Sequence, residues 1–301
     1  MSVIFLFIDG VGLGKADDTN PFTHSAYRGF SAMAGDQEFT EKASEQTETN
    51  HLFKFVDARL GVEGLPQSGT GQTALFTGKN APKEIGKHFG PFPHSGIKPF
   101  LKEQSLFIKA QQQGKTCTFM NAYPDIFFRK ARKRNRWSCT TLMTKSADIS
   151  LNTTREVKEG KALTAELTQK AWREQLNIDV PEISPEHAAD RLLEQSERYD
   201  LLLHEYYLTD KAGHSQELDR AAGFLNTYDR FLWHLIRNKS PDTTIVLSSD
   251  HGNVEDLSVK THTLNAVPLF VYGPEAQKFT TAKRISDVAP AILDALKKLT
   301  N

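Results

Sequence analysis

The sequence predicts an α/β fold: a doubly wound, mostly parallel sheet with helices on both faces. Two observations support this prediction. Short apolar runs of strand length end in acidic or polar residues, and helical patterns separate these runs along the chain. The runs are continuous rather than alternating, which is typical of strands buried on both faces, and 301 residues suffice for a sizeable core. Because ligands of such sheets bind outside the carboxyl ends of the strands, the residues that end the runs are candidates for the functional site.

Five apolar runs predict strands, at 3–10, 116–123, 201–210, 243–252 and 267–273. Helical patterns lie between them, at 71–76, 104–113, 185–198, 216–238 and 285–298. Ser184 is placed to cap the third of these helices. Strand and helix therefore alternate through most of the chain.

Residues 121–181 interrupt this alternation. They contain the basic run RKARKRNR (129–136), followed by polar segments of weak periodicity. We expect an insertion or small cap there, with 1–120 and 182–301 forming the core. The basic run is open to two interpretations: a hydrated face or loop, which is the usual role of a block of like charges, and a clamp for a substrate phosphate. Residues 36–50, rich in Gln, Glu and Thr, predict a surface loop or a frayed helix.

The amino-acid composition argues against several classes of function. Lys and Arg together number 37 and so do Asp and Glu, so no global field attracts nucleic acid or an anionic membrane. The first apolar run is too short to span a bilayer and is followed at once by Asp9, so we expect no signal peptide and a cytoplasmic protein. Cys117 and Cys139 have no paired spacing, so neither a disulfide framework nor a thiolate zinc site is indicated.

The stretch LPQSGTGQTALFTG (65–78) places two hydroxyls, Ser68 and Thr70, at the start of a helical pattern. One explanation is N-capping, because a hydroxyl there accepts a hydrogen bond from an otherwise unpaired amide. The other is a phosphate site, because the amides and the dipole of a helix N-terminus both favour an anion. In the second case Gly69 and Gly71 would leave room for a phosphate to approach the backbone.

Candidate metal ligands follow three of the predicted strands. An Asp at a strand end commonly caps the next helix, and a single His is commonly an ordinary polar residue, so each has a simpler explanation. Capping does not easily explain the whole set at one edge of the sheet. Carboxylate and imidazole ligands without thiolates suit one or two divalent cations such as zinc or manganese. The candidates are Asp9, Asp210, His214, Asp250, His251 and His262.

The order and spacing of these motifs resemble the alkaline phosphatase superfamily. The motifs are Asp9, DKAGH (210–214), DHG (250–252) and THTLNAVP (261–268). They are most similar to the branch that contains cofactor-independent phosphoglycerate mutase and phosphopentomutase, although Ala266 stands where that branch has a proline. The resemblance covers the chain from residue 3 to about residue 296, apart from the insertion.

The resemblance implies two divalent metal ions, zinc or manganese, in an arrangement suited to phosphoryl transfer. It also implies a nucleophile, because the spacing from Ser68 to Thr73 and Gly78 is similar to that of the family's catalytic serine. Thr70 stays open as the alternative. Gln67 replaces the acidic residue that precedes this serine in alkaline phosphatases, so their metal preference does not transfer. The implied ligands are Asp9, Asp250, His251 and the Ser68 oxygen for one metal, and Asp210, His214 and His262 for the other.

We therefore expect hydrolysis of a small phosphorylated substrate through a phosphoserine on Ser68. A phosphomutase is the alternative, but a mutase must retain its dephosphorylated intermediate under a lid, and the insertion is short. A catalytically silent metal-binding scaffold is the alternative outside enzymes. Sulfatases use a signature that this chain lacks. Candidate substrate contacts are Asn80, His88, Arg129 and Arg132.

Overall fold

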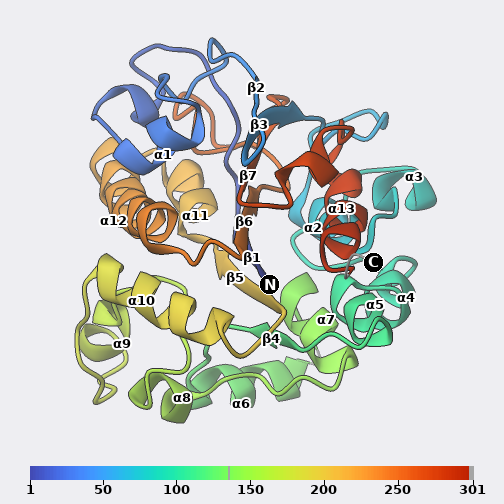
Figure 1. Cartoon of the computed structure of the whole chain (residues 1–301), viewed down its shortest axis with the longest axis vertical. Coiled ribbons are helices and arrows are strands. Elements are labelled where there is room, and N and C mark those ends of the chain that lie inside the picture. The colour runs from blue at the N-terminus through green and yellow to red at the C-terminus, as the bar shows by residue number, and fades with distance from the viewer. Residues whose placement is uncertain (135, 298–301) are drawn as a thin grey trace.

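The computed structural model describes residues 1–134 and 136–297, with the side chains of residues 132 and 134 outside that description. Seven strands form one sheet in the order β2-β3-β7-β6-β1-β5-β4 (Figure 1). Strands β4, β5, β1 and β6 are parallel to one another. The pairs β6–β7, β7–β3 and β3–β2 are antiparallel. The strands are β1 (Ser2–Ile8), β2 (Gln46–Thr47), β3 (His51–Val56), β4 (Cys117–Phe119), β5 (Leu201–Tyr206), β6 (Thr243–Ser248) and β7 (Val267–Tyr272).

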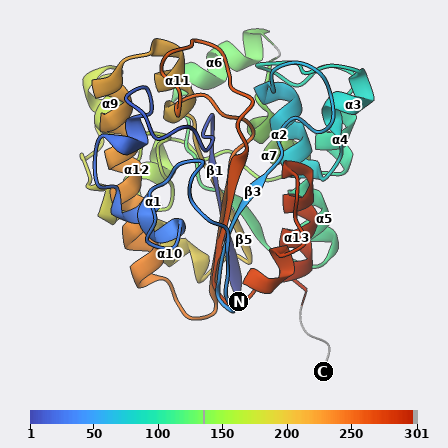
Figure 2. The same cartoon turned by 90° about the horizontal axis from the view of Figure 1, so that it is seen from above.

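Side chains of β1 alternate between two hydrophobic layers, as the twofold repeat of a strand requires. Val3 and Phe5 pack into one layer, and Ile4 and Leu6 into the other. Figure 2 shows the sheet nearly edge-on with helices on both sides, so the predicted doubly wound α/β fold is confirmed. The second layer is covered by α1 (Arg28–Met33), α10 (Pro185–Ser196) and α12 (Leu218–Asn238), and the first by α2 (Ser68–Thr77), α4 (Lys98–Glu103), α5 (Leu106–Gln112), α7 (Cys139–Ser146) and α13 (Val288–Ala295).

Residues 121–181 contribute to three hydrophobic clusters. Cys139 of α7 packs into the same layer as α2 and α4, and Leu163 packs into the opposite layer of the sheet. Val157 and Trp172 belong to a small separate cluster. The basic run mostly forms the end of a helix, on which Lys130 and Lys133 are exposed. The boundaries of the cap stay a prediction. Its other helices are α6 (Asp125–Arg134), α8 (Thr154–Lys158) and α9 (Lys170–Glu174).

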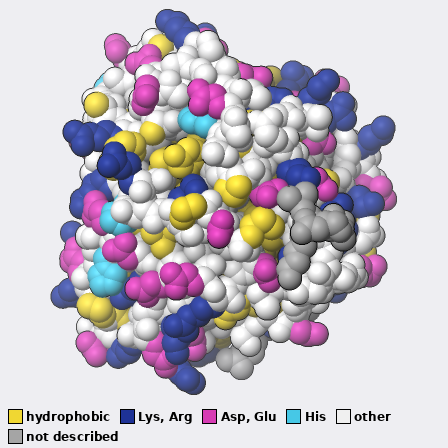
Figure 3. Space-filling view, viewed as in Figure 1, with side chains coloured by type: hydrophobic (Ala, Val, Ile, Leu, Met, Phe, Trp, Pro, Cys, Tyr) yellow, Lys and Arg dark blue, Asp and Glu magenta, His cyan; other side chains and the backbone are white. Residues whose placement is uncertain are grey.

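The remaining elements are short and lie at the ends of strands or in loops. Residues 36–50 form a loop that contains only the two-residue strand β2. Among the described residues, no helix is long and apolar enough to cross a membrane. On the face seen in Figure 3, acidic and basic side chains are interspersed, as the balanced composition predicts. The short elements are η1 (Pro21–Thr23), α3 (Ala81–Ile85), α11 (Leu208–Ser215), η2 (Ala276–Phe279) and η3 (Ile285–Asp287).

The two ends of the sheet differ. The N-terminus lies at the end from which the parallel strands start (Figure 2). Helices α6 and α11 lie at the opposite end, where those strands finish (Figure 2). The candidate ligands follow the strands at this second end, in agreement with the position expected of a ligand site in a doubly wound sheet.

Candidate metal centre

The sheet brings the three candidate aspartates to one edge. Asp9 follows β1 directly, Asp250 follows β6 by two residues, and Asp210 lies in the first turn of α11, just after β5. His214 lies four residues after Asp210 on the same helix, so both side chains lie on one helix face. Strand order therefore places Asp9 next to His251, which lies 242 positions further along the sequence.

The first cluster consists of Asp9, Asp250 and His251, whose ligand atoms all lie within 4.8 Å of one another. Nε2 of His251 is 3.5 Å from Oδ1 of Asp9 and 3.4 Å from Oδ2 of Asp250. Oγ of Ser68 is 3.1 Å from the same nitrogen. The hydroxyl expected to be the nucleophile thus lies beside the two carboxylates.

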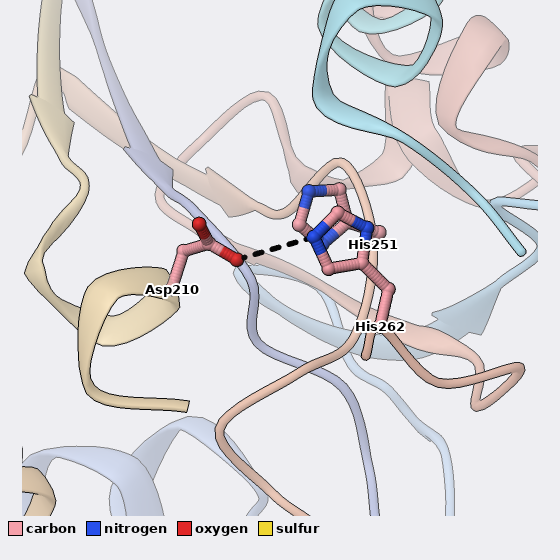
Figure 4. Close-up of side chains that lie close together, drawn as sticks. All are labelled: Asp210, His251 and His262. Carbon is pink, nitrogen blue, oxygen red and sulfur yellow. Dashed lines mark ion pairs between the residues drawn. The ribbon is translucent and has the colours of Figure 1, made fainter. Parts of the chain in front are cut away.

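The second cluster consists of Asp210, His214 and His262. The Asp210 carboxylate is 3.4 Å from Nε2 of His214 and 3.6 Å from Nε2 of His262, and these two nitrogens are 3.3 Å apart. Figure 4 shows Asp210 from α11 facing imidazoles from the loops after β6. His251 lies between the clusters, because its ring stacks on that of His262 at 3.7 Å and its ligand atom is also within 4.8 Å of Asp210.

Backbone carbonyls orient two of the histidines. Nδ1 of His262 lies 2.6 Å from the carbonyl oxygen of Pro66, and Nδ1 of His214 lies 2.7 Å from that of Lys260. A carbonyl oxygen can only accept, so each Nδ1 carries a hydrogen and each Nε2 faces the cluster, where it can bind a metal ion once it is deprotonated. This is the usual arrangement behind a metal-binding histidine.

The carboxylates of the first cluster are buried without full hydrogen bonding. Oδ1 of Asp9 and Oδ2 of Asp250 have no hydrogen-bond partner among the described residues. Burial, with the neighbouring Asp210 charge, raises the pKa of Asp250 to about 7, and burial with the Asp250 charge raises the pKa of Asp9 well above its usual value. Buried, unpaired carboxylates are costly, and a divalent cation bound between them would offset the cost. This donor set of oxygen and nitrogen fits such a cation.

The second cluster has a different charge balance. Burial alone would raise the pKa of Asp210, but the hydrogen bond with His214 and the neighbouring histidines lower it below its usual value. The same hydrogen bond raises the pKa of His214 to about 9 against the effect of burial. Burial lowers the pKa of His262, which favours the neutral imidazole that binds metals.

The two candidate nucleophiles differ in their surroundings. Ser68 is the first residue of α2 and faces His251. The Thr70 hydroxyl is fully buried, donates to the carbonyl oxygen of Gln67 and accepts from the amide of Phe89. The geometry therefore brings Ser68 to the candidate ligands and gives Thr70 a role in holding the loop that follows α3.

The glycines around Ser68 serve packing. A Cβ on Gly69 would lie 2.3 Å from the carbonyl oxygen of Phe92, and one on Gly71 would lie 2.7 Å from that of Asp250. Backbone from two other segments thus occupies the space that we expected a phosphate to use beside these glycines. Because glycine has no side chain, the first turn of α2 can pack against the backbone of Phe92 and Asp250.

A cleft of about 1160 Å³ opens from this centre. Its lining includes Asp9, Ser68, Asp210 and His214. It continues between the N-terminal half of α12, helix α9 and the residues that lead into α6. We call it the site cleft.

The other sequence candidates do not line the site cleft. Asn80 caps α3 by accepting from the amide of Lys83 at 3.1 Å, and it donates to the carbonyl oxygen of Leu60. His88 lies 3.3 Å from the carbonyl oxygen of Val62, and burial lowers its pKa. Arg129 is exposed on α6 outside the lining. The side chain of Arg132 lies outside the described part of the structure.

Sequence analysis missed Glu205, which lies in β5 and lines the site cleft. One of its oxygens accepts from the Thr140 hydroxyl at 2.9 Å, and burial raises its pKa to about 7. Asn121 holds its backbone by one donated and one accepted hydrogen bond. An acidic residue within an apolar run, LLLHEYYL, was the feature that could have identified it.

Sequence analysis also missed Glu255, which is 1% exposed. Oε1 accepts from the Thr263 hydroxyl and from Nδ2 of Asn265, and Oε2 accepts from the amides of Gly12 and Asn253. Each donor lies within three residues in sequence of a candidate metal ligand. A Cβ on Gly12 would lie 2.4 Å from Oε1, so glycine is needed where this loop meets the carboxylate. Glu255 therefore holds the loop after β1 against two parts of the long connection between β6 and β7, one next to His251 and one next to His262.

Comparison with known proteins finds similar chains for the second half of the sequence. Residues 174–298 match the model of the metalloenzyme superfamily. Over 124 residues, 38% of the chain, the sequence is 32% identical to the 2,3-bisphosphoglycerate-independent phosphoglycerate mutase of Desulforudis audaxviator. It is 29% identical to the enzyme of the same name from Clostridioides difficile over 39% of the chain. These matches span 24% and 25% of the relatives, so the chain covers about a quarter of their length.

Two solved structures share the fold along nearly the whole chain. The alkaline phosphatase of the Antarctic bacterium TAB5 superposes with a TM-score of 0.61 at 14% identity, over 99% of both chains. The cold-active alkaline phosphatase of a Shewanella species gives 0.56 at 15% identity, over 99% of this chain and 100% of the other. At this identity the likeness concerns the fold.

Proposed function

We propose that the chain is a metalloenzyme of the alkaline phosphatase superfamily and that it hydrolyses a phosphoester through a phosphoserine on Ser68. The observation that carries the proposal is the position of the Ser68 hydroxyl, 3.1 Å from Nε2 of His251 and beside the buried carboxylates of Asp9 and Asp250. A hydroxyl among metal ligands is the arrangement that activates a weak nucleophile.

The two clusters would each hold one divalent metal ion, zinc or manganese. When bound, such ions neutralise the attacking and leaving oxygens of an in-line displacement and lower the pKa of a coordinated hydroxyl. We assign Asp9, Asp250, His251 and the Ser68 oxygen to one ion, and Asp210, His214 and His262 to the other.

The protein's own groups then orient the phosphoryl group. Ser68 and Gly69 occupy the first turn of α2, and no hydrogen bond among the described residues uses their backbone amides. These amides and the helix dipole favour a phosphoryl oxygen beside the nucleophile. The Oγ–P bond forms as the P–O bond to the alcohol breaks. Water then attacks the same phosphorus, which releases inorganic phosphate and regenerates Ser68.

The state of the site cleft favours hydrolysis over a mutase reaction. The side chain of His214, in the second cluster, is 47% exposed and lines the cleft, so water has access to the centre. A mutase must keep its dephosphorylated intermediate away from water. The names of the relatives make the mutase the second candidate, with an isomeric phosphoester rather than free phosphate as its product.

The experiment is a phosphate-release assay on protein loaded with zinc or manganese, using a panel of phosphomonoesters, phosphodiesters and phosphosugars. We expect phosphate release by wild type and by Thr70→Val, and loss of release in Ser68→Ala. An isomeric phosphoester without free phosphate would establish the mutase instead. Bound metal without any turnover across the panel would contradict both and leave the scaffold.

A further inference from the structure

Beyond the metal centre, the site cleft has an unusual composition. Six aromatic side chains line its outer wall, and the rings come from five separate segments of the chain. In Figure 2, α6, α9 and α11, which border this part of the cleft, lie at the end of the molecule where the parallel strands finish. The aromatic residues of this wall are Phe92, Tyr123, Phe127, Trp172, Tyr207 and Phe224.

These side chains form a surface rather than a filled core. Tyr123 and Phe127 stack on each other at 4.0 Å and present a flat wall. Phe92, Leu176 and Tyr207 are 38%, 42% and 45% exposed. Few large hydrophobic side chains of the described residues are this exposed, and these three gather around one cleft. Apolar surface concentrated in this way marks a ligand-binding site.

The charges of the cleft do not provide a second anion site. Of its cationic side chains, Lys170 lies 3.9 Å from Glu174, and Arg220 lies 3.9 Å from Glu217. Arg220 also covers the ring of Phe224 at 5.7 Å. Lys211, the third cation, has no ion pair among the described residues, but four acidic residues outside the candidate ligands share the cleft with these three cations. These acidic lining residues are Glu166, Glu174, Glu205 and Asp219.

The size of the cleft also argues against a small substrate. Its volume of about 1160 Å³ exceeds the roughly 300–1,000 Å³ of pockets that bind drug-sized ligands. A phosphorylated three-carbon acid would leave most of it to water and would find no free cationic pair for its carboxylate. A bulky apolar group would cover the aromatic wall while its phosphate reached Ser68.

We infer that the substrate is a phosphoester of a bulky, apolar alcohol that carries no second negative charge. This inference rests on the proposed function for the position of the phosphate, and on the site cleft for the alcohol. The apolar group can be a ring system or an aliphatic chain, since either would remove the same wall from water. The phosphoglycerate named for the relatives belongs to a different class.

Binding tests the inference without turnover. Phosphonates of one phosphate-like head and three alcohol-like parts, 2-(2-naphthyl)ethyl, octyl and ethyl, are titrated calorimetrically into zinc-loaded Ser68→Ala protein, together with 3-phosphoglycerate. We expect the naphthylethyl or the octyl compound to bind about 50-fold more tightly than the ethyl compound. This factor corresponds to the removal of about 100 Å² more apolar ligand surface from water. The compound that binds more tightly of these two shows whether the apolar group is a ring system or an aliphatic chain. Equal affinity for all three phosphonates, or stronger binding of 3-phosphoglycerate, would overturn the inference.

Substitutions in the wall locate the effect. Leu176→Ser and Tyr207→Ser should each reduce the preference over ethylphosphonate at least threefold, while Ile126→Ser, equally an exposed apolar residue but outside the lining, should retain it. An undiminished preference in both wall variants would place the apolar group elsewhere and refute the inference.

Turnover is read separately, as phosphate release from ethyl phosphate and 2-(2-naphthyl)ethyl phosphate, whose alcohols leave with similar ease. Release from both at equal kcat/KM would retain the proposed function and refute the inference. Selective phosphonate binding without release of phosphate from either ester would support the inference and refute the proposed hydrolysis.

Discussion

Replacing Glu255 with Gln should destabilise the fold strongly although the two side chains have nearly the same shape. The carboxylate accepts four hydrogen bonds, two on each oxygen, from Gly12, Asn253, Thr263 and Asn265. An amide keeps one accepting oxygen and turns its NH₂ group toward the other two donors. At about 1.5–3 kcal/mol for each hydrogen bond to a charged group, the loss is about 3–6 kcal/mol, a large part of a typical domain's stability.

The assay is equilibrium unfolding in urea, with the Glu255→Gln variant compared with wild type and with Glu63→Gln, which makes the same change on an exposed loop. Zinc titration should also show weaker binding, because the lost hydrogen bonds join the loops that carry the candidate ligands. A free energy of unfolding within about 1 kcal/mol of wild type would show that Glu255 does not hold these loops together.

Three further substitutions test the electrostatics and the capping. Asp250→Asn should raise the midpoint of thermal unfolding in the presence of a chelator, because the substitution removes a buried carboxylate charge. Added zinc should raise the midpoint of wild type but not that of the variant. A variant that zinc still stabilises fully would contradict the ligand assignment. His204 is fully buried, neither ring nitrogen has a hydrogen-bond partner among the described residues, and burial lowers its pKa to about 4. Since the unfolded chain takes up that proton first, wild type should lose about 3 kcal/mol relative to His204→Leu as the pH falls from 6.5 to 4, and parallel stability curves would refute this. Asp229 accepts hydrogen bonds from the amides of Gly29 and Phe30 at the start of α1. Asp229→Ala should therefore lower the free energy of unfolding in urea by about 2 kcal/mol and leave kcat unchanged. A lower kcat would show that α1 affects the site.

The sequence predicted the central strands and the residues that end them because both depend on local composition. A strand buried on both faces is a continuous apolar run, and the first polar residue after it, such as Asp9, lies at the edge where ligands bind. Strand β3 was missed because its sequence HLFKFV is only partly buried, and because its partner β7 lies about 200 residues further along the chain.

The site was only partly predictable, because some roles arise from contacts between distant segments. The function of Glu255 depends on the approach of the loop after β1 to two parts of the connection between β6 and β7, which no local pattern records. The glycines beside Ser68 fit a phosphate-binding turn in sequence, yet the backbone of Phe92 and Asp250 occupies the space next to them. Helix α7 lies inside the segment expected to be a cap and packs into the main core through Cys139, because apolar residues in a short helix do not indicate which layer they join.

The most direct test of the central claim is peptide mapping by mass spectrometry of metal-loaded protein, quenched in acid during turnover of a phosphoester. The account predicts one added phosphate on Ser68 in wild type and in Thr70→Val, and none in Ser68→Ala. A phosphate on Thr70, or phosphate release that persists in Ser68→Ala without any labelled peptide, would contradict the account.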